Sequence, residues 1–181
     1  VAVVPLHKGA GDASYDGLGT ALAGMLVSDL SKVDGLQLVE RERLGDLLQE
    51  MELAETGFLD EASAQELGKG LGAELVVTGS FSVVKDVFLM DTRMVEVQTG
   101  KVLEAARADG PAADFVAIEK EVDDGLIEGL QVEVSSSVRR KIMIEAPSEK
   151  IDALASYGRG IEAEDSGRIE EARKAYQEAL A

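Results

Sequence analysis

The first part of the chain alternates short apolar runs with segments in which large apolar residues recur every three or four positions. The β-branched run Val1–Leu6 predicts a strand, and the glycines that follow it predict a loop. Leucine and methionine then recur at helical spacing from about Tyr15 to Val33, which predicts an amphipathic helix that Gly35 ends. The further elements expected before residue 72 are a strand at 36–40 and helices at 44–51 and 61–71.

The middle of the chain has the pattern of three strands joined by tight turns. Residues 74–84 form a nearly continuous apolar run, typical of a strand that is buried on both faces and therefore central. Lys85-Asp86 is short enough for a hairpin turn into a strand at 87–97, and Thr99-Gly100 turns the chain into a strand at 101–107. These features predict an antiparallel β-meander.

A long helix with two different faces is expected from Pro111 onward. Its apolar face should cover the sheet, and its acidic face should be solvated. The apolar positions are Phe115, Ile118, Val122, Leu126, Leu130 and Val134, and the acidic positions are Glu119, Glu121, Asp123, Asp124 and Glu128.

The order of elements predicts an α/β domain, because helix-linked strands are most simply parallel and hairpin-linked strands antiparallel. We expect a mixed sheet, with a parallel β-α-β start and an antiparallel β-meander, flanked by helices. Residues 1–142 are assigned to this domain, and 143–150 to a linker that follows the basic cluster at 139–141. Residues 151–181 are expected to form a C-terminal helical hairpin that is broken at Ser166-Gly167.

Composition narrows the class of function. A hydrophobic fraction of 45% with 29% charged residues is that of a folded protein. The 18 basic and 35 acidic side chains give a net charge of −17, which disfavours nucleic acid and anionic lipid as partners. Because the chain has no cysteine and a single histidine, thiolate zinc sites and multi-histidine metal sites are excluded. No run approaches the roughly 20 apolar residues of a membrane-spanning helix, so no transmembrane segment is expected.

The loop after the first strand is the first candidate for chemistry. Gly9-Ala10-Gly11 follows a strand, as phosphate loops do, but the lysine and hydroxyl residue of a P-loop are absent, and Asp12 and Asp16 would repel phosphate. His7 could act as an acid–base group oriented by Asp12 or Asp16. An ordinary strand-to-helix loop with a structural histidine is the preferred interpretation.

Paired carboxylates are the second candidate for chemistry. Asp60-Glu61, Asp123-Asp124 and Glu162-Ala163-Glu164-Asp165 offer oxygen ligands, but none has the alternating spacing of a calcium loop. We interpret them as solvated helix faces. The sequence therefore predicts no catalytic, cofactor-binding or metal-binding residue.

Four stretches taken together resemble the CsgG/TolB-N-like domain of bacterial envelope proteins, in order and spacing across residues 1 to about 135. The family includes the curli secretion channel CsgG and relatives of penicillin-binding-protein activators, so the resemblance implies protein interaction and no enzymatic activity. A pore needs about 9 to 11 residues per membrane-crossing strand, and the short connections at 82–87 and 105–115 leave no room for pore hairpins. The stretches are Val1–Leu6, 38–41 leading into 44–48, Leu71–Ser80 and Arg93–Leu103.

The tail at 151–181 resembles one tetratricopeptide repeat, although Ser156 and Arg159 depart from its usual large apolar residues. A single helix pair cannot bury its own apolar face, and such arrays usually need about three repeats. The covering is expected to come from further repeats beyond Ala181, from the α/β domain or from another subunit. Matching positions are Gly160, Ala163, Gly167, Ile169, Ala172, Tyr176, Ala179 and Leu180, and the residues expected to bind a partner are Tyr157, Gly160, Ala163, Tyr176 and Leu180.

The resulting hypothesis is a non-enzymatic interaction or scaffold module of the bacterial cell envelope. We expect protein partners, with self-association as one form, and a role in assembly, secretion or regulation of envelope machinery. The expected location is the periplasm, with a lipid anchor upstream of Val1 as a route to the outer membrane. Two alternatives stay open: a ligand-sensing or enzymatic domain that uses His7, Asp12 and Asp16, and a cytoplasmic regulator.

Overall fold

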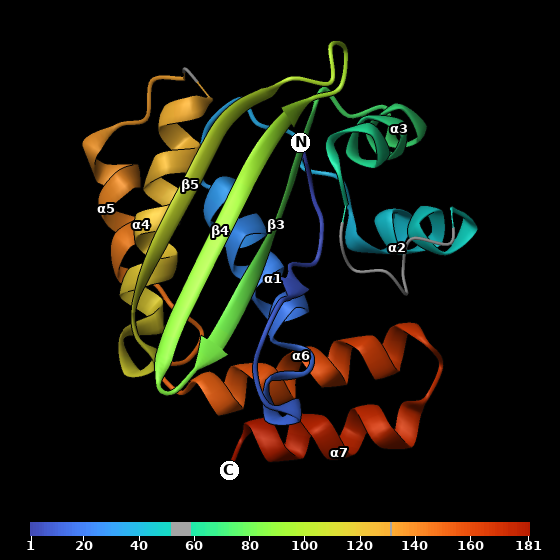
Figure 1. Ribbon diagram of the computed structural model, residues 1–181, viewed down its shortest axis with the longest axis vertical. Helices are drawn as coiled ribbons and strands as arrows, with labels where there is room; N and C mark the ends of the chain where they lie inside the picture. The colour runs from blue at the N-terminus through green and yellow to red at the C-terminus, as the bar shows by residue number, and fades with distance from the viewer. Residues whose placement is uncertain (52–58, 131) are drawn as a thin grey trace.

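The computed structural model describes residues 1–51, 59–130 and 132–181, and its centre is a five-stranded mixed sheet (Figure 1). The interior strand β3 (Leu75–Val84) pairs in parallel with β1 (Ala2–Val3) and β2 (His7–Lys8), and antiparallel with β4 (Val87–Glu96). On its other side β4 pairs antiparallel with β5 (Val102–Pro111). The predicted mixed sheet and its antiparallel meander are confirmed.

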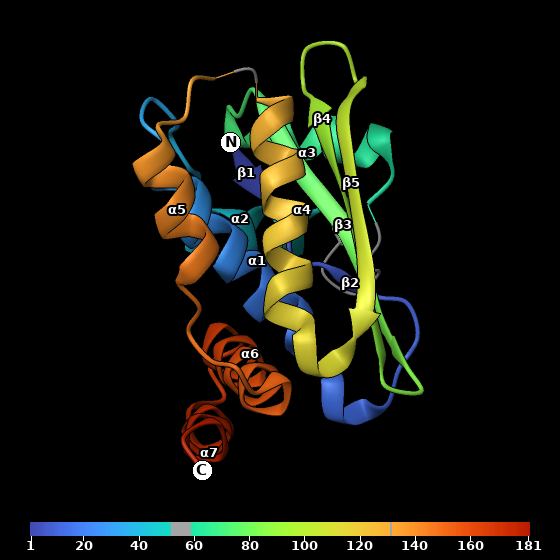
Figure 2. The same cartoon turned by 90° about the vertical axis from the view of Figure 1, so that its left-hand side faces the viewer.

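Helices cover the two faces of the sheet unequally. α1 (Leu18–Leu30) and α4 (Phe115–Gly129) lie on one face along the length of the long strands, as Figure 2 shows. α2 (Arg41–Glu50) and α3 (Glu61–Leu71) cover only one end of the opposite face. The first core includes Leu22, Leu26, Phe81, Phe88 and Phe115, and the smaller second core includes Ala2, Leu67, Val76 and Val95.

Turn and cap residues set the ends of several elements. Lys85 and Asp86 both have positive φ, as a two-residue hairpin turn between β3 and β4 requires. Asp60 caps α3, because its Oδ1 accepts a hydrogen bond from the Ser63 amide at 2.8 Å, and its neighbour Glu61 pairs with Arg93 on β4 at 2.7 Å. The acidic pair Asp60-Glu61 therefore has structural partners.

The N-terminal run is not one continuous strand, and the strand expected at 36–40 is absent. The first run divides into β1 and β2, and between them the amide of Leu6 donates to Gly19 O at 3.1 Å. Residues 36–40 have no regular secondary structure, and their hydrogen bonds toward the sheet go to Val1: Val1 N to Gln37 O at 2.6 Å and Val39 N to Val1 O at 2.9 Å. A strand needs a ladder of partners, and the single residue Val1, just before β1, is too little to form one.

Two helix predictions also need correction. The helix expected at 15–33 is preceded by the 3₁₀ turn η1 (Ala13–Tyr15), and α1 itself begins only after Gly17, which has φ 84°. A second 3₁₀ turn, η2 (Ala112–Asp114), leads into α4, which ends at Gly129. Leu130 and Val134 therefore lie beyond that helix.

The basic cluster at 139–141 lies within a helix that the sequence did not predict, α5 (Ser136–Ile144). Arg139 pairs with Asp124 of α4 at 2.8 Å, which fixes α5 to the outer side of α4. The linker predicted at 143–150 begins inside this helix.

The C-terminal helices α6 (Ile151–Asp165) and α7 (Ile169–Ala179) form an antiparallel pair broken at Ser166-Gly167. The pair lies across one end of the sheet domain, with α6 against α1. Leu154 and Ala155 of α6 belong to the first core. Within the part of the chain that the structure describes, no helix is long and apolar enough to cross a bilayer.

Candidate functional site

The apolar side of α6 is covered by the α/β domain, which is one of the three coverings considered above. The contact is close because two glycines meet: a Cβ on Gly158 would lie 1.9 Å from the carbonyl oxygen of Gly17. Arg159 holds the contact from the side, because its Nη1 donates to Ser14 O at 3.1 Å, and its Nη2 pairs with Glu178 of α7 at 3.2 Å, which ties the two tail helices together. The tail therefore docks on the sheet domain along a specific surface.

The expected partner-binding residues are divided between the interior and the surface of the tail. Gly160 lies beneath the ring of Tyr176, where a Cβ would come within 2.3 Å of the ring, and Ala163 is buried. The rings of Tyr157 and Tyr176 lie 5.8 Å apart, and the Tyr176 hydroxyl donates to Glu164 Oε2 at 2.6 Å. Tyr157 is 47% exposed and Leu180 is 89% exposed. Only the last two present a large exposed side chain.

A groove of about 830 Å³ lies between α1, α2 and α6, and we call it the α1 groove. Its floor is the side of α1 that carries Gly24 and Val27, and one wall is the apolar side of α2 with Leu44 and Leu48. Tyr157 and Ile161 of α6 form the opposite wall, and the α5–α6 connection closes one end. The groove joins segments far apart in the sequence, and one predicted site residue, Tyr157, lines it.

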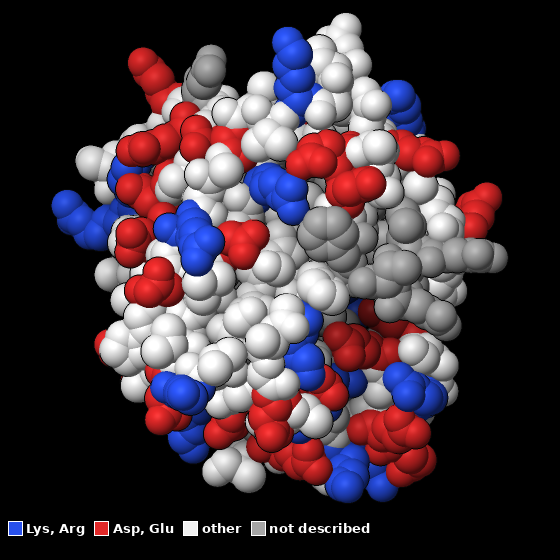
Figure 3. Space-filling model, viewed as in Figure 1, with Lys and Arg blue, Asp and Glu red and all other residues white. Residues whose placement is uncertain are grey.

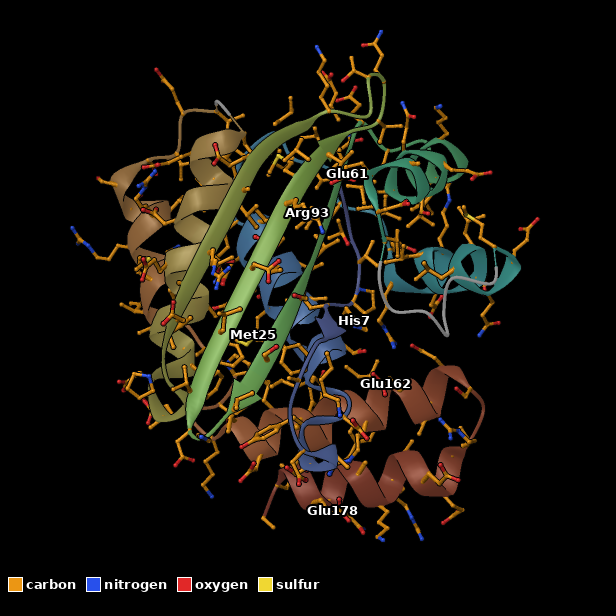
Figure 4. The ribbon with its side chains drawn as sticks, in the orientation of Figure 1. His7, Met25, Glu61, Arg93, Glu162 and Glu178 are labelled. Carbon is orange, nitrogen blue, oxygen red and sulfur yellow. The ribbon has the colours of Figure 1, made fainter. Side chains whose placement is uncertain are left out.

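Charged residues occupy the rim and one end of the α1 groove. Arg41 of α2 and Asp165 of α6 pair across the rim, with the Arg41 Nη1 at 2.7 Å from both carboxylate oxygens. Glu162 accepts a hydrogen bond from the Thr20 hydroxyl at 2.7 Å, which ties α6 to α1. Figure 4 labels Glu162 on the side of α6 that faces the sheet domain, and Glu178 on α7. The run Glu162–Asp165 therefore contributes to helix contacts and to the rim.

The closed end of the groove leads to a cluster of buried charges that corrects the sequence prediction. Glu119 and Asp123 were expected to be solvated, yet both are fully buried, because α1 and α5 pack on that side of α4. The ammonium of Lys120 pairs with Asp29 of α1 and lies 3.0 Å from Glu119 Oε2 and 3.6 Å from Asp123 Oδ2. Three buried carboxylates thus share one buried ammonium.

The other oxygen of Asp29 reaches Lys32 at 2.7 Å, and Lys32 also pairs with Glu145 at 2.8 Å. The carboxylates of Asp29, Glu119 and Asp123 offer oxygens within 4.8 Å of one another, a spacing that a metal ion could bridge. Both oxygens of Asp29 are already bonded to lysines, however. We therefore describe it as a buried acid cluster whose Asp29 carboxylate is paired with Lys32 and Lys120.

Burial shapes the protonation of this cluster. It raises the pKa of Glu119 to about 7 and raises the pKa of Asp123 well above its usual value, where the nearby Glu119 carboxylate adds to the effect. Burial also opposes ionisation of Asp29, but hydrogen bonds from Asp123, Lys120 and Lys32 hold its pKa below the usual value. Asp29 is therefore the ionised partner of Lys120, and the other two carboxyl groups retain protons to higher pH.

The polar groups of the loop after the first strand are used in contacts that hold the loop to the rest of the protein. Gly9 N donates to Phe81 O at 2.8 Å, and Ala10 N donates to the Ser82 hydroxyl at 3.1 Å, so these amides are not available to a phosphate. Asp12 Oδ1 accepts from the Ser14 amide at 2.9 Å, a hydrogen bond that lowers the Asp12 pKa. Asp16 pairs with Lys8. His7 lies in β2, half-buried, opposite Ser80 of β3.

Figure 3 shows acidic and basic side chains mixed at the top and bottom of this view, whereas its middle is mostly uncharged. Few signals for the α1 groove can be read from the amino-acid sequence. Gly17 and Gly158 were the available ones, because each allows a close backbone approach.

A comparison with protein families matches residues 6–84 to "Curli production assembly/transport component CsgG". This segment contains β2, α1, α2, α3 and β3, and so includes the floor and one wall of the α1 groove. The match confirms the CsgG-like resemblance for that part of the chain. The tetratricopeptide resemblance of the tail stays a prediction.

A solved structure of E. coli LpoB supports the mixed α/β fold. E. coli LpoB is similar at 18% identity with a TM-score of 0.50, covering 59% of this chain and 53% of that one. The C-terminal domain of LpoB from Salmonella enterica matches at 17% identity and a TM-score of 0.47, covering 61% of this chain and 80% of that one.

A curated relative comes from a different class of protein. "Putative adenylate cyclase 3" of Rhizobium meliloti (strain 1021) is 24% identical over 156 residues, which is 85% of this chain and 25% of the relative. The chain thus spans about a quarter of the length of that relative.

Proposed function

We propose that this chain is a non-enzymatic protein-interaction module of the bacterial cell envelope. The observation that carries the proposal is the α1 groove, a mainly apolar hollow of about 830 Å³ that the CsgG-like segment and the tail build together. Sizeable apolar hollows on a folded domain mark binding sites for proteins or ligands. The CsgG family description, that of an assembly and transport component, favours a protein partner in the envelope.

The engagement of the first loop supports the non-enzymatic part of this proposal. Of the three residues of the alternative ligand-sensing or enzymatic site, His7, Asp12 and Asp16, Asp12 caps a 3₁₀ turn and Asp16 pairs with Lys8, and the loop amides bond to β3. A thermal-shift screen with nucleotides and divalent metals tests this point, since a ligand at a hundred times its dissociation constant stabilises by about 2.7 kcal/mol. We expect no shift, and a reproducible nucleotide-dependent shift would favour the ligand-sensing alternative.

The interaction role is tested in cells of the source bacterium. A photo-crosslinking amino acid replaces Tyr157 in the groove, and a control replaces the exposed Ile169 on α7. We expect the protein in the periplasmic or outer-membrane fraction, and crosslinks to a defined envelope protein from position 157 and not from position 169. Crosslinks that are equal from both positions, or absent from both, would contradict a role for the groove.

A second candidate is a regulatory domain in a longer cytoplasmic signalling protein. It is favoured by the match to the putative adenylate cyclase, which extends over 85% of this chain. Cell fractionation separates the two candidates, because cytoplasmic recovery of the full-length protein would support the regulator and contradict the envelope location. Light scattering of the purified chain tests self-association, the other partner considered.

A further inference from the structure

The α1 groove has a shape that accepts side chains from outside. A Cβ built on Gly24, on the floor, or on Gly45, in the α2 wall, meets no atom within 4 Å. Bare backbone at both positions leaves room for apolar side chains of an occupant. The apolar walls formed by Leu44, Leu48 and Ile161 would bury them.

The secondary structure of the groove restricts the kind of polypeptide that fits. Its floor and both walls are mainly helices, whose backbone amides and carbonyls are bonded within each helix. The edge strand β1 also reaches the groove through Val3, but it is two residues long and offers an extended peptide too short a ladder to satisfy its own backbone groups. A helix satisfies its backbone internally and can place an apolar stripe in such a groove.

The charged residues along the groove indicate whether its occupant should be basic or acidic. Asp29, Glu145, Glu162 and Asp165 line it, against Lys32, Arg41 and Lys120. Each lining cation is already paired with a lining carboxylate. Among the residues that the structure describes, Glu162 bonds to the Thr20 hydroxyl and has no lysine or arginine at ion-pair distance. The groove therefore has an excess of negative charge, as does the chain at −17.

We propose that the α1 groove binds a basic amphipathic helix of a partner protein. The apolar stripe of that helix lies on α1 between α2 and α6, and a lysine or arginine beside the stripe reaches Glu162. This inference rests on the proposed interaction function and deepens it by naming the kind of partner. The surface charge steers the basic helix to the chain, and the apolar groove holds it.

The test uses the full chain and two synthetic peptides of about 14 residues, enough for about four helical turns. One combines leucine with lysine and the other places glutamate at the lysine positions, so the apolar stripes are the same. Binding is measured by fluorescence anisotropy at physiological salt. We expect the lysine peptide to bind at least about tenfold more tightly than the glutamate peptide.

Two pairs of variants separate groove binding from general charge attraction. Gly24→Leu places an apolar side chain in the groove, starting from a position where an added Cβ meets no atom within 4 Å, and leaves the net charge unchanged. It should weaken binding of the lysine peptide by about tenfold or more. Gln177→Leu, on the exposed side of α7, is its control and should bind normally. Glu162→Gln should weaken binding several-fold more than Glu66→Gln, an exposed site on α3 with the same charge change. Circular dichroism confirms that each variant is folded.

Each other outcome overturns a defined part of the inference. Unchanged lysine-peptide binding to Gly24→Leu would mean attraction to the general surface charge and would sink the groove proposal. Equal binding of both peptides, lost in Gly24→Leu, would overturn the basic partner and leave the interaction function standing. No binding of either peptide, with crosslinks from position 157 in cells, would overturn the helical partner alone.

Discussion

At the residue scale, burial changes the acid–base chemistry of Glu119. Its pKa is raised from 4.5 to about 7 by burial in the folded chain, whereas the unfolded chain should show the lower value. Between these two pH values the folded state binds more protons than the unfolded state. Its stability is therefore highest below about pH 4.5 with respect to this group, and falls as pH rises through 7.

We predict that Glu119→Gln removes most of this fall. The gap of about 2.5 pKa units corresponds to roughly 3 kcal/mol in the free energy of unfolding above pH 7, to which the raised pKa of Asp123 adds in the same direction. Urea unfolding at pH 5 and pH 8 measures it. The variant and the parent should differ little at pH 5, and the variant should be more stable at pH 8.

Glu121→Gln is the matched control for this prediction, since Glu121 is exposed on the same helix. It should leave the pH dependence of the parent unchanged. If both variants behave alike, the carboxyl group of Glu119 is not the source of the pH dependence.

Gly158 supports a second prediction at this scale. An added Cβ would lie 1.9 Å from the backbone oxygen of Gly17, and backbone cannot move aside as a flexible side chain can. Gly158→Ala should therefore separate α6 from α1 or cost about 2 to 4 kcal/mol in the free energy of unfolding. Gly24→Ala is the control, because its Cβ meets open space and alanine favours helix by up to about 1 kcal/mol. Equal thermal stability of the two variants would contradict the close contact.

At the scale of elements, Lys120 joins α4 to α1 through Asp29. We predict that Lys120→Met destabilises the chain by about 3 to 5 kcal/mol at pH 8, because it leaves the buried carboxylates without their cation. The loss should be smaller at pH 5, where Glu119 and Asp123 can hold protons. Lys69→Met, an exposed position on α3, should have little effect at either pH. A Lys120→Met chain with the same loss at both pH values would argue against titrating carboxyl groups in the cluster.

Elements defined by local pattern were predictable from the sequence. The apolar spacing of α1, α2 and α3 reflects the packing of one helix face on the sheet, and that of β3 reflects the burial of both its faces. Each of these elements lies close to its expected position. Residues 36–40 have the same local character, but whether they form a strand depends on the length of β1, which ends at Val3, two residues before Pro5. Local pattern does not contain that information.

The candidate site was harder to predict, for a physical reason. Glu119 and Asp123 have the spacing of a solvated helix face, and their burial depends on Asp29, which is 91 positions from Lys120 in the chain. The groove likewise arises only when α6 docks on α1 beside α2. Tyr157 could be predicted from its residue type and its position in the tail. Gly24 and Gly45 could not, because they contribute to the groove only through the open space beside their backbone.

At the scale of the whole molecule, the question is whether the tail and the sheet domain unfold as one unit. The shared core at Leu154 and Ala155 and the Gly17–Gly158 contact argue that they do. The three tyrosines offer a local probe, because Tyr157 and Tyr176 lie in the tail and Tyr15 lies in the turn that the tail covers. The helices that dominate the far-UV circular dichroism are spread over the molecule.

We therefore predict that tyrosine fluorescence and far-UV circular dichroism give the same urea midpoint for the parent chain, as a two-state transition requires. In Gly158→Ala the two midpoints should separate, with the tyrosine signal changing at lower urea, because the tail then loses its docking surface first. Coincident midpoints in the parent and in the variant would mean that the tail stays docked without the glycine contact. An early tyrosine transition in the parent would mean that the tail is an independent unit, and the α1 groove, which needs α6 as a wall, would then be a transient surface.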